Sequence, residues 1–467
     1  MRFEMNQVNL LTPPIHFIGI GGAGMSGIAR ICIDRGLAVS GSDAKASTTL
    51  EALALQGAKV HVGHDAAHIG QARTVVISSA IREQNAELIA ARERGLEIRT
   101  RAQALATLLD GYTSIAVAGT HGKTTTTSML TITLQGLGMD PSFAIGGTPH
   151  DSRANSHHGT GSTFVVEADE SDGSFVEYHP DYAIITNVEV DHVDHFADES
   201  AINAAFEALV RTVKEGVILC GDDPGSARLA AIAREQGLDT YIYGEGDASD
   251  LRITHIHTGP EKSFYRATWQ GSVLGEVSLA IPGLHNVHNS AAALTMALVL
   301  KAPASEAIKH LGSFTGVGRR FELRGSARGI RVFDDYAHHP TEVRATIATA
   351  RLVANERDGR VIAIFQPHRY SRTAAFSEQF ASELKAADYA LLLDIYGAGE
   401  EPIPGASSAA ISAMITKLGG VSDFEPNLMK AIERAVLFAQ GNDIILTMGA
   451  GDVTSLAPQI IAAINEH

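Results

Sequence analysis

The sequence predicts an α/β protein with parallel sheets, because short apolar runs, glycine-rich turns and amphipathic stretches follow one another repeatedly. The runs HFIGI, TVVISSAI and SIAVAGT each precede such a turn or a helical pattern. Continuous Val, Ile and Leu runs that alternate with helical patterns are typical of parallel sheets covered on both faces. Further strand candidates are TFVVEAD, YAIITNV, GVILC, RVIAIFQ, YALLLDIY and DIILTMGAG.

The chain is too long for one domain, because its 467 residues exceed the roughly 250–300 at which single cores stop growing. Breaks at LLDGYTS and at the glycine-rich FTGVGRRFE predict three domains, 1–110, 111–318 and 319–467. Within the second, residues 251–281 alternate like antiparallel strands and form an insertion among the βα units.

Composition limits the function classes. The formal charge of −16 argues against a chain-wide nucleic-acid surface. No apolar run approaches the roughly 20 residues of a membrane span, and the first residues lack a signal-peptide pattern. Cys32 and Cys220 sit in apolar stretches, as buried free thiols of a reducing compartment do. We therefore expect a cytoplasmic protein that binds neither nucleic acid nor membrane.

The first glycine loop, Gly19-x-Gly21-x-x-Gly24, follows a strand and opens a helix. Glycines allow close approach of a diphosphate, which then lies at the positive helix N-terminus. Asp43, 19 residues after Gly24, stands where a ribose-binding acid is expected. The loop alone leaves NAD, another phosphorylated nucleotide and a purely structural turn as alternatives.

The second glycine loop, GTHGKT from Gly119 to Thr124, also lies between a strand and a helix. Its backbone N–H groups can bind phosphate oxygens, Lys123 can reach the terminal phosphates, and the hydroxyl of Thr124 or Thr125 can bind Mg²⁺. The general P-loop pattern requires a glycine where Val117 stands, so this loop is two residues shorter. ATP is the predicted ligand; the alternative is a helix start with a chance Gly-Lys-Thr.

Charged and polar clusters follow the second loop at the ends of later strand candidates. Their oxygen and imidazole donors suit a magnesium site beside a triphosphate, although each cluster alone is also typical of a solvated loop. In PGLHNVHNSAAAL, asparagine and histidine can bind a purine, or Asn289 can cap the following helix. Arginines can bind carboxylate or phosphate, or be simple surface residues. The clusters comprise Glu167, Asp169, Glu170 and Asp172; Asn187; Asp191, His192, Asp194 and His195; His285, Asn286, His288 and Asn289; Arg319 and Arg320; Asp334, Asp335, Tyr336, His338 and His339; and His368, Arg369 and Arg372.

Taken together, these segments resemble the Mur ligase family over essentially the whole chain. The resemblance rests on the segments FIGIGGAGMSGIA, GTHGKTTTT, EADESDGSF, TNVEVDHVDH, GLHNVHNSAAA, FTGVGRRFE, DDYAHHPTE, FQPHRYSRT and TMGAGD. The shortened second loop matches the family's own form. The stretch ESAINAAFEALVRTV contains no lysine, so we expect no carbamylated lysine of the kind found in some family members.

The resemblance implies an N-terminal Rossmann-like domain that binds a UDP-sugar instead of NAD, a central P-loop ATPase-type domain, and a C-terminal Rossmann-like domain. It implies ATP and Mg²⁺ as cofactors, UDP-N-acetylmuramate and L-alanine as substrates, and domain rotation near residues 110 and 318. The expected reaction activates a carboxylate as an acyl phosphate, which the amine then attacks, within cytoplasmic peptidoglycan precursor synthesis. No base for the amine is assigned, and the chain is expected to be a monomer or homodimer.

The resemblance also implies residue roles. The expected UDP-sugar site contains Gly19, Gly21, Gly22, Gly24, Met25, Ser26, Asp43, Ser78 and Ser79. The expected ATP site contains Gly119, Thr120, His121, Gly122, Lys123, Thr124 and Thr125, with His285, Asn286 and Asn289 near adenine and ribose, and Arg320 and Asp335 from the C-terminal half. The expected metal site contains Thr124, Glu167 and His192. Tyr336, His339, His368, Arg369 and Arg372 fall where acyl phosphate and alanine would meet; the expected catalytic set is Lys123, Glu167, His192, Arg320, His368, Arg369 and Arg372.

Two other function classes remain possible from the residues alone. A nicotinamide oxidoreductase would use the first loop but leaves GTHGKTTTT unexplained. A nucleotide-sensing module would use both loops without chemistry, and the acidic, histidine and arginine clusters argue against it.

Overall fold

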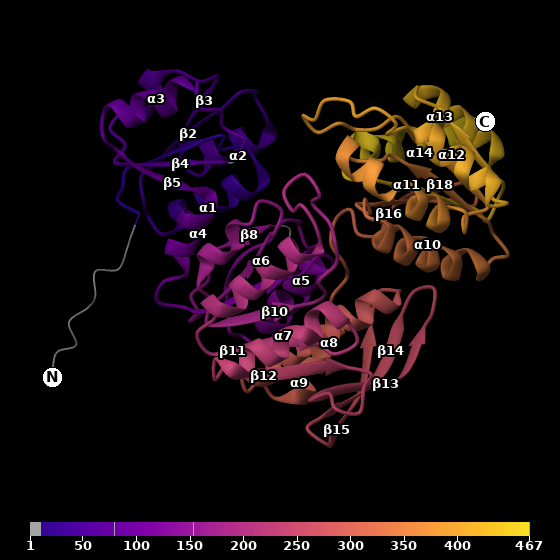
Figure 1. Cartoon of the computed structure of the whole chain (residues 1–467), viewed down its shortest axis with the longest axis horizontal. Helices are drawn as coiled ribbons and strands as arrows, with labels where there is room; N and C mark the ends of the chain where they lie inside the picture. Colours follow the sequence, from indigo (N-terminus) through magenta and orange to yellow (C-terminus); the bar gives the residue numbers. More distant parts are fainter. Residues whose placement is uncertain (1–10, 79, 153, 467) are drawn as a thin grey trace. The chain divides into compact units, whose positions relative to one another are not determined.

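The computed structural model describes residues 11–78, 80–152 and 154–466, and these form an α/β protein, as predicted (Figure 1). Ser79, an expected substrate-binding residue, lies outside the described residues. The chain divides into two compact units. The first comprises Met1–Val188, Asn203–Asp250 and Ala292–His310, and the second comprises Glu189–Ile202, Leu251–Ala291 and Leu311–His467.

The N-terminal sheet of the first unit has five parallel strands in the order β3-β2-β1-β4-β5. The order reverses beside β1, and ligands of open α/β sheets bind at such a switch point, beyond the carboxyl ends of the strands. The Gly19–Gly24 loop leaves β1 at this edge. The bounds are β1 Ile15–Ile18, β2 Val39–Asp43, β3 Lys59–Val62, β4 Thr74–Ile77, β5 Glu97–Thr100, α1 Ala23–Asp34, α2 Thr48–Leu55, α3 Ala86–Glu93, α4 Arg101–Leu109 and the 3₁₀ helix η1 Ala66–Ile69.

The second sheet of the first unit has strands in the order β12-β11-β10-β6-β9-β7-β8. They pair in parallel except β8, which is antiparallel to β7. β6 lies between β10 and β9, so the second glycine loop, which follows β6, is flanked by the ends of both neighbours. The bounds are β6 Thr113–Ala118, β7 Ser142–Ala144, β8 Ser156–His157, β9 Thr163–Glu167, β10 Tyr182–Ile185, β11 Gly216–Cys220, β12 Asp239–Gly244, α5 Lys123–Gly136, α7 Pro224–Glu235, α9 Ala304–Leu311 and η2 Ser174–Tyr178. The helices α6 Glu199–Thr212 and α8 Leu284–Val299 contain residues of both units, and the last residue of α9, Leu311, belongs to the second unit.

The second unit contains the predicted antiparallel strands, β13 Leu251–Thr258, β14 Ser263–Trp269 and β15 Ser272–Leu279. It also contains a six-stranded sheet in the order β16-β17-β21-β18-β19-β20, parallel except for β16. The central strands β18 and β21 are buried along their whole length, which explains their continuous apolar runs. The bounds are β16 Glu322–Ala327, β17 Ile330–Asp335, β18 Val361–Phe365, β19 Tyr389–Leu392, β20 Ser422–Phe424, β21 Ile444–Met448, α10 Pro340–Asn355, α11 Tyr370–Leu384, α12 Ser408–Lys417, α13 Leu428–Phe438, α14 Leu456–Glu466 and η3 Asp452–Ser455.

The two cysteines are buried free thiols, as predicted. Among the described residues, no helix has the length and apolar character that a membrane crossing requires.

Candidate active site

The first glycine loop makes a tight turn between β1 and α1. Gly19 has φ +84°, a left-handed conformation that glycine adopts without strain. At Gly21 a Cβ would lie 2.7 Å from Leu50 Cδ1 and 2.9 Å from Asp43 Oδ2, so a larger residue would displace these two side chains. Gly22 and Gly24 are exposed, and Gly22 precedes α1 without a side-chain cap. The turn therefore offers uncapped helix N–H groups at an exposed surface, as an anion site requires.

Four other expected substrate residues lie around this turn. Asp43 ends β2, and its Oδ2 accepts a hydrogen bond of 2.9 Å from Gly21 N. Ser78 follows β4, with its Oγ 3.4 Å from the position of a Cβ on Gly19. Met25 and Ser26 are buried in the first turn of α1. The hydrogen bond from Gly21 to Asp43 holds the loop, and direct binding of a ligand by these four side chains stays a prediction.

Arg101, the first residue of α4, is a neighbour of the loop that sequence reasoning missed. Its Cδ would lie 3.2 Å from a Cβ on Gly24. Burial alone would lower the pKa of Arg101, but Tyr178, Asp169 and Asp172 raise it above the ordinary arginine value. A positive charge thus stands beside the proposed anion loop. No motif marked this arginine in the sequence.

The second glycine loop packs tightly against the end of β10. Gly119 has φ +130°, and a Cβ there would lie 2.0 Å from Thr186 Oγ1. The Asn187 side chain accepts from His121 N at 2.8 Å and donates to His121 O at 3.0 Å. Gly122, with φ +82°, then leads into α5. The Asn187 side chain therefore fixes the position of the loop by binding both backbone groups of His121.

Lys123 folds back over the loop that precedes it. Its Nζ donates to Gly119 O at 2.8 Å, to Thr120 O at 3.1 Å and to Glu170 Oε1 at 2.8 Å. Burial would lower the pKa of Lys123, but Glu170 and Asp169 raise it, so the ammonium is charged. Glu170 is fully buried and acts as its counter-ion. From the sequence alone, Glu170 was interpreted only as one of several possible metal ligands.

Thr124 and Glu167 meet at the carboxyl edge of the second sheet. Thr124 Oγ1 donates to Glu167 Oε1 at 2.8 Å, and Gly146 N donates to Glu167 Oε2 at 2.7 Å. A hydroxyl and a carboxylate oxygen beside a phosphate-type loop are the hard donors that Mg²⁺ prefers. The residues present fit this metal. Thr125 is buried on the same helix turn.

In the second unit, Asp191 and Arg372 form a buried ion pair, with Arg372 Nε donating to Asp191 Oδ1 at 2.8 Å. Burial would raise the pKa of Asp191, but Arg372, His192 and His338 hold it well below its usual range. His192 Nε2 lies 3.8 Å from Asp191 Oδ2. His192, an expected metal ligand, belongs to this unit.

His368 and Arg369 precede α11. Burial, together with the charges of Arg372 and Arg369, lowers the pKa of His368 to about 4, so its imidazole is neutral at pH 7. The His368 ring stacks on Tyr396, with ring centroids 5.6 Å apart. Arg369 has φ +69° and pairs with Asp194 and, at 3.5 Å, with Glu400. The expected cluster around FQPHRYSRT is thus brought together within this unit.

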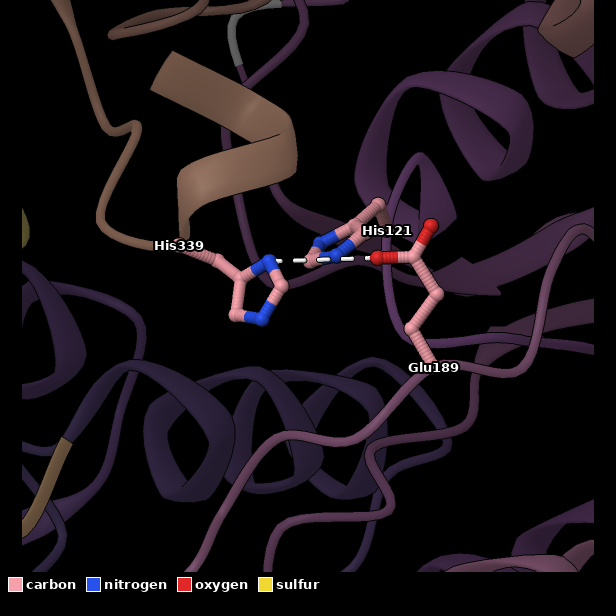
Figure 2. A group of neighbouring side chains, drawn as sticks. All are labelled: His121, Glu189 and His339. Atoms are coloured by element: carbon pink, nitrogen blue, oxygen red, sulfur yellow. Dashed lines mark ion pairs between the residues drawn. The ribbon is translucent and has the colours of Figure 1, made fainter. Parts of the chain in front are cut away.

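His339 caps helix α10 and has a structural use that the sequence did not reveal. Its Nδ1 accepts from Thr341 N at 3.3 Å and its Nε2 lies 3.1 Å from Val190 O. Figure 2 shows its contact with Glu189, whose Oε2 lies 4.0 Å from His339 Nδ1. Thr341 Oγ1 donates to the same carboxylate oxygen of Glu189 at 2.6 Å. The ring of His339 therefore joins residues 189–190 to the start of α10.

Two arginines that precede β16 lie over the ring of Tyr336, which follows β17. The guanidinium carbons of Arg319 and Arg320 lie 4.9 and 5.0 Å from the centre of the Tyr336 ring. Asp335, at the end of β17, accepts from Phe321 N at 2.6 Å and Ala337 N at 2.7 Å. Burial raises the pKa of Asp335 to about 6, although Arg320 and these hydrogen bonds oppose the rise.

The segment LHNVHNS lies in α8, which begins at Leu284, directly after Gly283. The alternative in which Asn289 caps this helix is wrong, because the helix starts five residues before it. Asn286 Nδ2 instead donates to Pro282 O at 2.7 Å. Burial and the charge of Arg320 lower the pKa of His285 to about 4, which leaves a neutral ring.

Comparison with known proteins shows that models of one family match the three parts of the chain that contain these features. Models described as "Mur ligase family, catalytic domain", "Mur ligase middle domain" and "Mur ligase, glutamate ligase domain" match residues 14–113, 117–297 and 319–451. A UDP-N-acetylmuramate–L-alanine ligase of Acidothermus cellulolyticus is 46% identical over 455 residues, covering 97% of this chain and 95% of the relative. The enzyme of that name from Renibacterium salmoninarum is 47% identical over 467 residues, covering 99% and 98%.

A solved structure of an enzyme with the same substrates in its name is also similar to this chain. The crystal structure of a UDP-N-acetylmuramate–alanine ligase from Thermotoga maritima has a TM-score of 0.80 and 28% identity to this chain. The match covers 97% of this chain and 99% of that one.

Replacement of Gly119 by alanine should destabilise the protein through a steric clash. The added Cβ would overlap Thr186 Oγ1 at 2.0 Å, in addition to the strain of φ +130°. We expect the free energy of unfolding to fall by about 2 kcal/mol or more, measured by urea denaturation. Gly138→Ala is the matched control, since Gly138 has φ +76° and no atom within 4 Å of the Cβ position. Equal losses in the two variants would contradict this explanation.

Asp335 should make stability depend on pH. Its pKa rises from the ordinary 3.8 to about 6 on folding, so its contribution is fully present below pH 3.8 and is lost as the pH rises through 6. The loss should be about 2–3 kcal/mol relative to Asp335→Asn, measured by urea unfolding between pH 3.5 and 7. The exposed Asp358→Asn should keep the wild-type pH profile. A profile that Asp335→Asn leaves unchanged would count against the assignment.

Proposed function

This chain belongs to the Mur ligase family, and on that premise we propose that it is an ATP-dependent ligase that joins L-alanine to UDP-N-acetylmuramate. Its curated relatives of that name match nearly the whole chain, which supports the substrates. The observation that carries the proposal is the second glycine loop with its partners. The loop combines an N–H-lined helix start, the Lys123 ammonium and the Thr124–Glu167 oxygen pair. This set suits a nucleoside triphosphate that gives up its terminal phosphate.

The reaction requires activation of a carboxylate. The lactyl carboxylate oxygen of the UDP-sugar attacks the γ-phosphorus, the bond to the β–γ bridging oxygen breaks, and ADP leaves. The alanine amine then attacks the carbonyl of the acyl phosphate, the C–O bond breaks, and inorganic phosphate leaves. A base must accept one proton from the attacking amine, and we assign none. Catalysis of this kind depends on positioning and charge stabilisation more than on covalent help.

In the first unit, Lys123 is proposed to move from Glu170 to the transferring phosphate, with the backbone of residues 119–122 binding the β- and γ-phosphate oxygens. Thr124 and Glu167 would hold Mg²⁺, which neutralises phosphate charge when bound. Thr125, a buried residue on the same helix turn, completes this group. His192, which belongs to the second unit, is retained as a proposed metal ligand.

The glycine loop after β1 is proposed to bind the diphosphate of UDP-N-acetylmuramate. Gly19, Gly21, Gly22 and Gly24 allow close approach, while Met25, Ser26, Asp43, Ser78 and Ser79 complete the proposed site. Arg101, which lies beside Gly24, adds a positive charge suited to the same diphosphate. An arginine there lowers the electrostatic cost of bringing two phosphates to the loop.

In the second unit, the proposed nucleotide residues are His285, Asn286, Asn289, Arg320 and Asp335. The neutral ring of His285 is suited to stacking on a base instead of pairing with phosphate. Tyr336 and His339 with His368, Arg369 and Arg372 are proposed to border the acyl phosphate and alanine. Arg372 would act while paired with Asp191, which fixes its guanidinium.

We also propose domain boundaries after residues 110 and 318, a cytoplasmic location, and a monomer or homodimer. The first matched family model ends at residue 113 and the second begins at 117, close to the first proposed boundary. The second model ends at residue 297 and the third begins at 319, directly after the second proposed boundary.

The proposed function is tested by a four-component assay. Phosphate release should require the protein, ATP with Mg²⁺, UDP-N-acetylmuramate and L-alanine together, and mass spectrometry should find the alanylated nucleotide sugar. Glycine and L-serine in place of L-alanine measure specificity. Phosphate release that continues unchanged without an amino acid would rule out the ligase.

Lys123→Ala should lower kcat by about 10²–10³-fold, because one charge-stabilising group is removed from the transferring phosphate. The Kd for UDP-N-acetylmuramate, measured by titration calorimetry, should change less than about twofold. Lys309→Ala, at an exposed lysine, is the control and should keep wild-type turnover. Near-normal turnover of Lys123→Ala would refute the proposed role.

A further inference from the structure

A buried carboxylate with several histidines lies beneath the first glycine loop. Glu87, in the first turn of α3, is fully buried. Its neighbours come from β1, β2, the loop before η1, and η1 itself. They are His16, Ser42, His64 and His68.

Each carboxylate oxygen of Glu87 has two neighbours. Oε2 accepts from Ser42 Oγ at 2.5 Å and from His64 Nδ1 at 2.9 Å. Oε1 lies 3.5 Å from His16 Nε2 and 3.2 Å from His68 Nδ1. His68 in turn stacks on His61, with ring centroids 4.1 Å apart. Glu87 is thus the centre of a polar cluster that joins four parts of the domain.

The centre of this cluster is charged. Burial would raise the pKa of Glu87, but His16, Ser42 and His64 outweigh it and lower the pKa to about 2. His61, which stacks on His68 in the same cluster, has a pKa below its ordinary value. Burial and the charges of His68, Lys59 and His16 lower it. A carboxylate that is ionised throughout the physiological range therefore faces the strand that supports the loop.

Ser42 connects Glu87 to the loop. The carbonyl oxygen of Ser42 accepts from Gly19 N at 2.8 Å and from Ile20 N at 3.0 Å. The side chain of the next residue, Asp43, accepts from Gly21 N at 2.9 Å. Residues 42 and 43 therefore receive three consecutive N–H groups of the loop. The hydroxyl of Ser42 is anchored by Glu87 on the other side of the strand.

A purely stabilising role does not account for this arrangement. Burying a carboxylate among imidazoles costs desolvation energy, and apolar side chains of similar volume often stabilise a core equally well. What a charged, directional contact adds is a fixed position for its partner. Here the partner is the strand end that holds the diphosphate loop.

We propose that Glu87 is a positioning residue that acts through Ser42 to hold the Gly19–Gly24 loop in the geometry that binds the diphosphate of the nucleotide sugar. This inference rests on the proposed function, because it assigns that ligand to the first loop. Glu87 itself is buried behind the loop and does not touch the ligand.

The test compares Glu87→Gln, Ser42→Ala and the double variant with Glu93→Gln, an exposed glutamate of the same helix. The Kd for UDP-N-acetylmuramate and for ATP is measured by calorimetry, alongside kcat and KM. Each single variant should weaken UDP-N-acetylmuramate binding by about tenfold, as expected for loss of a hydrogen bond to a charged group. The Kd for ATP and the kcat at saturation should change less than twofold, and Glu93→Gln should match wild type.

The double variant distinguishes action through Ser42 from independent effects. Residues that act in one chain give non-additive losses, so the double variant should bind about as weakly as either single one. Wild-type affinity in Glu87→Gln, additive losses, or an equal loss of ATP affinity would each overturn the inference. If Glu87→Gln does not fold, Ser42→Ala with wild-type affinity would overturn it alone. Failure of the wild-type protein to bind UDP-N-acetylmuramate would instead refute the proposed function.

Discussion

The buried contact between the Lys123 ammonium and Glu170 is the constraint on which the ATP-type loop depends. A lysine at the start of α5 lies where the helix N-terminus is already positive, so an unpaired ammonium there would be unfavourable. Glu170 and the carbonyl oxygens of Gly119 and Thr120 compensate by closing around it. These contacts fix the conformation of the loop around the Lys123 ammonium. Phosphate oxygens could bind the same ammonium in place of Glu170.

The two glycine loops use similar backbone chemistry but different supports. The first is held by a strand carbonyl and the carboxylate of Asp43, which receive consecutive N–H groups. The second is held by the amide of Asn187, which both donates to and accepts from His121. A carboxylate tends to repel an incoming anion, whereas an amide is neutral. The charge of Arg101 beside Gly24 offsets this difference at the first loop.

Sequence reasoning was most reliable where one residue type is required by local geometry. Gly119 and the buried strands were identifiable because positive φ and burial on both faces leave few choices. It missed Glu87 and Arg101, since each depends on partners from distant strands or loops and carries no local pattern. The N-cap interpretation of Asn289 failed because the preceding Leu284–His288 segment already forms helix. The family resemblance supplied roles that spacing alone left open.

The Asp191–Arg372 pair joins residues 181 positions apart in the sequence. Asp191 lies between β10 and β11 in the central block, yet its counter-ion belongs to α11 in the C-terminal block. A fragment ending near residue 318 would contain this acid without its guanidinium, and would lack the six-stranded sheet of the second unit. Each of the two compact units therefore combines segments that are far apart in the sequence, which matters for any gene truncation or domain exchange.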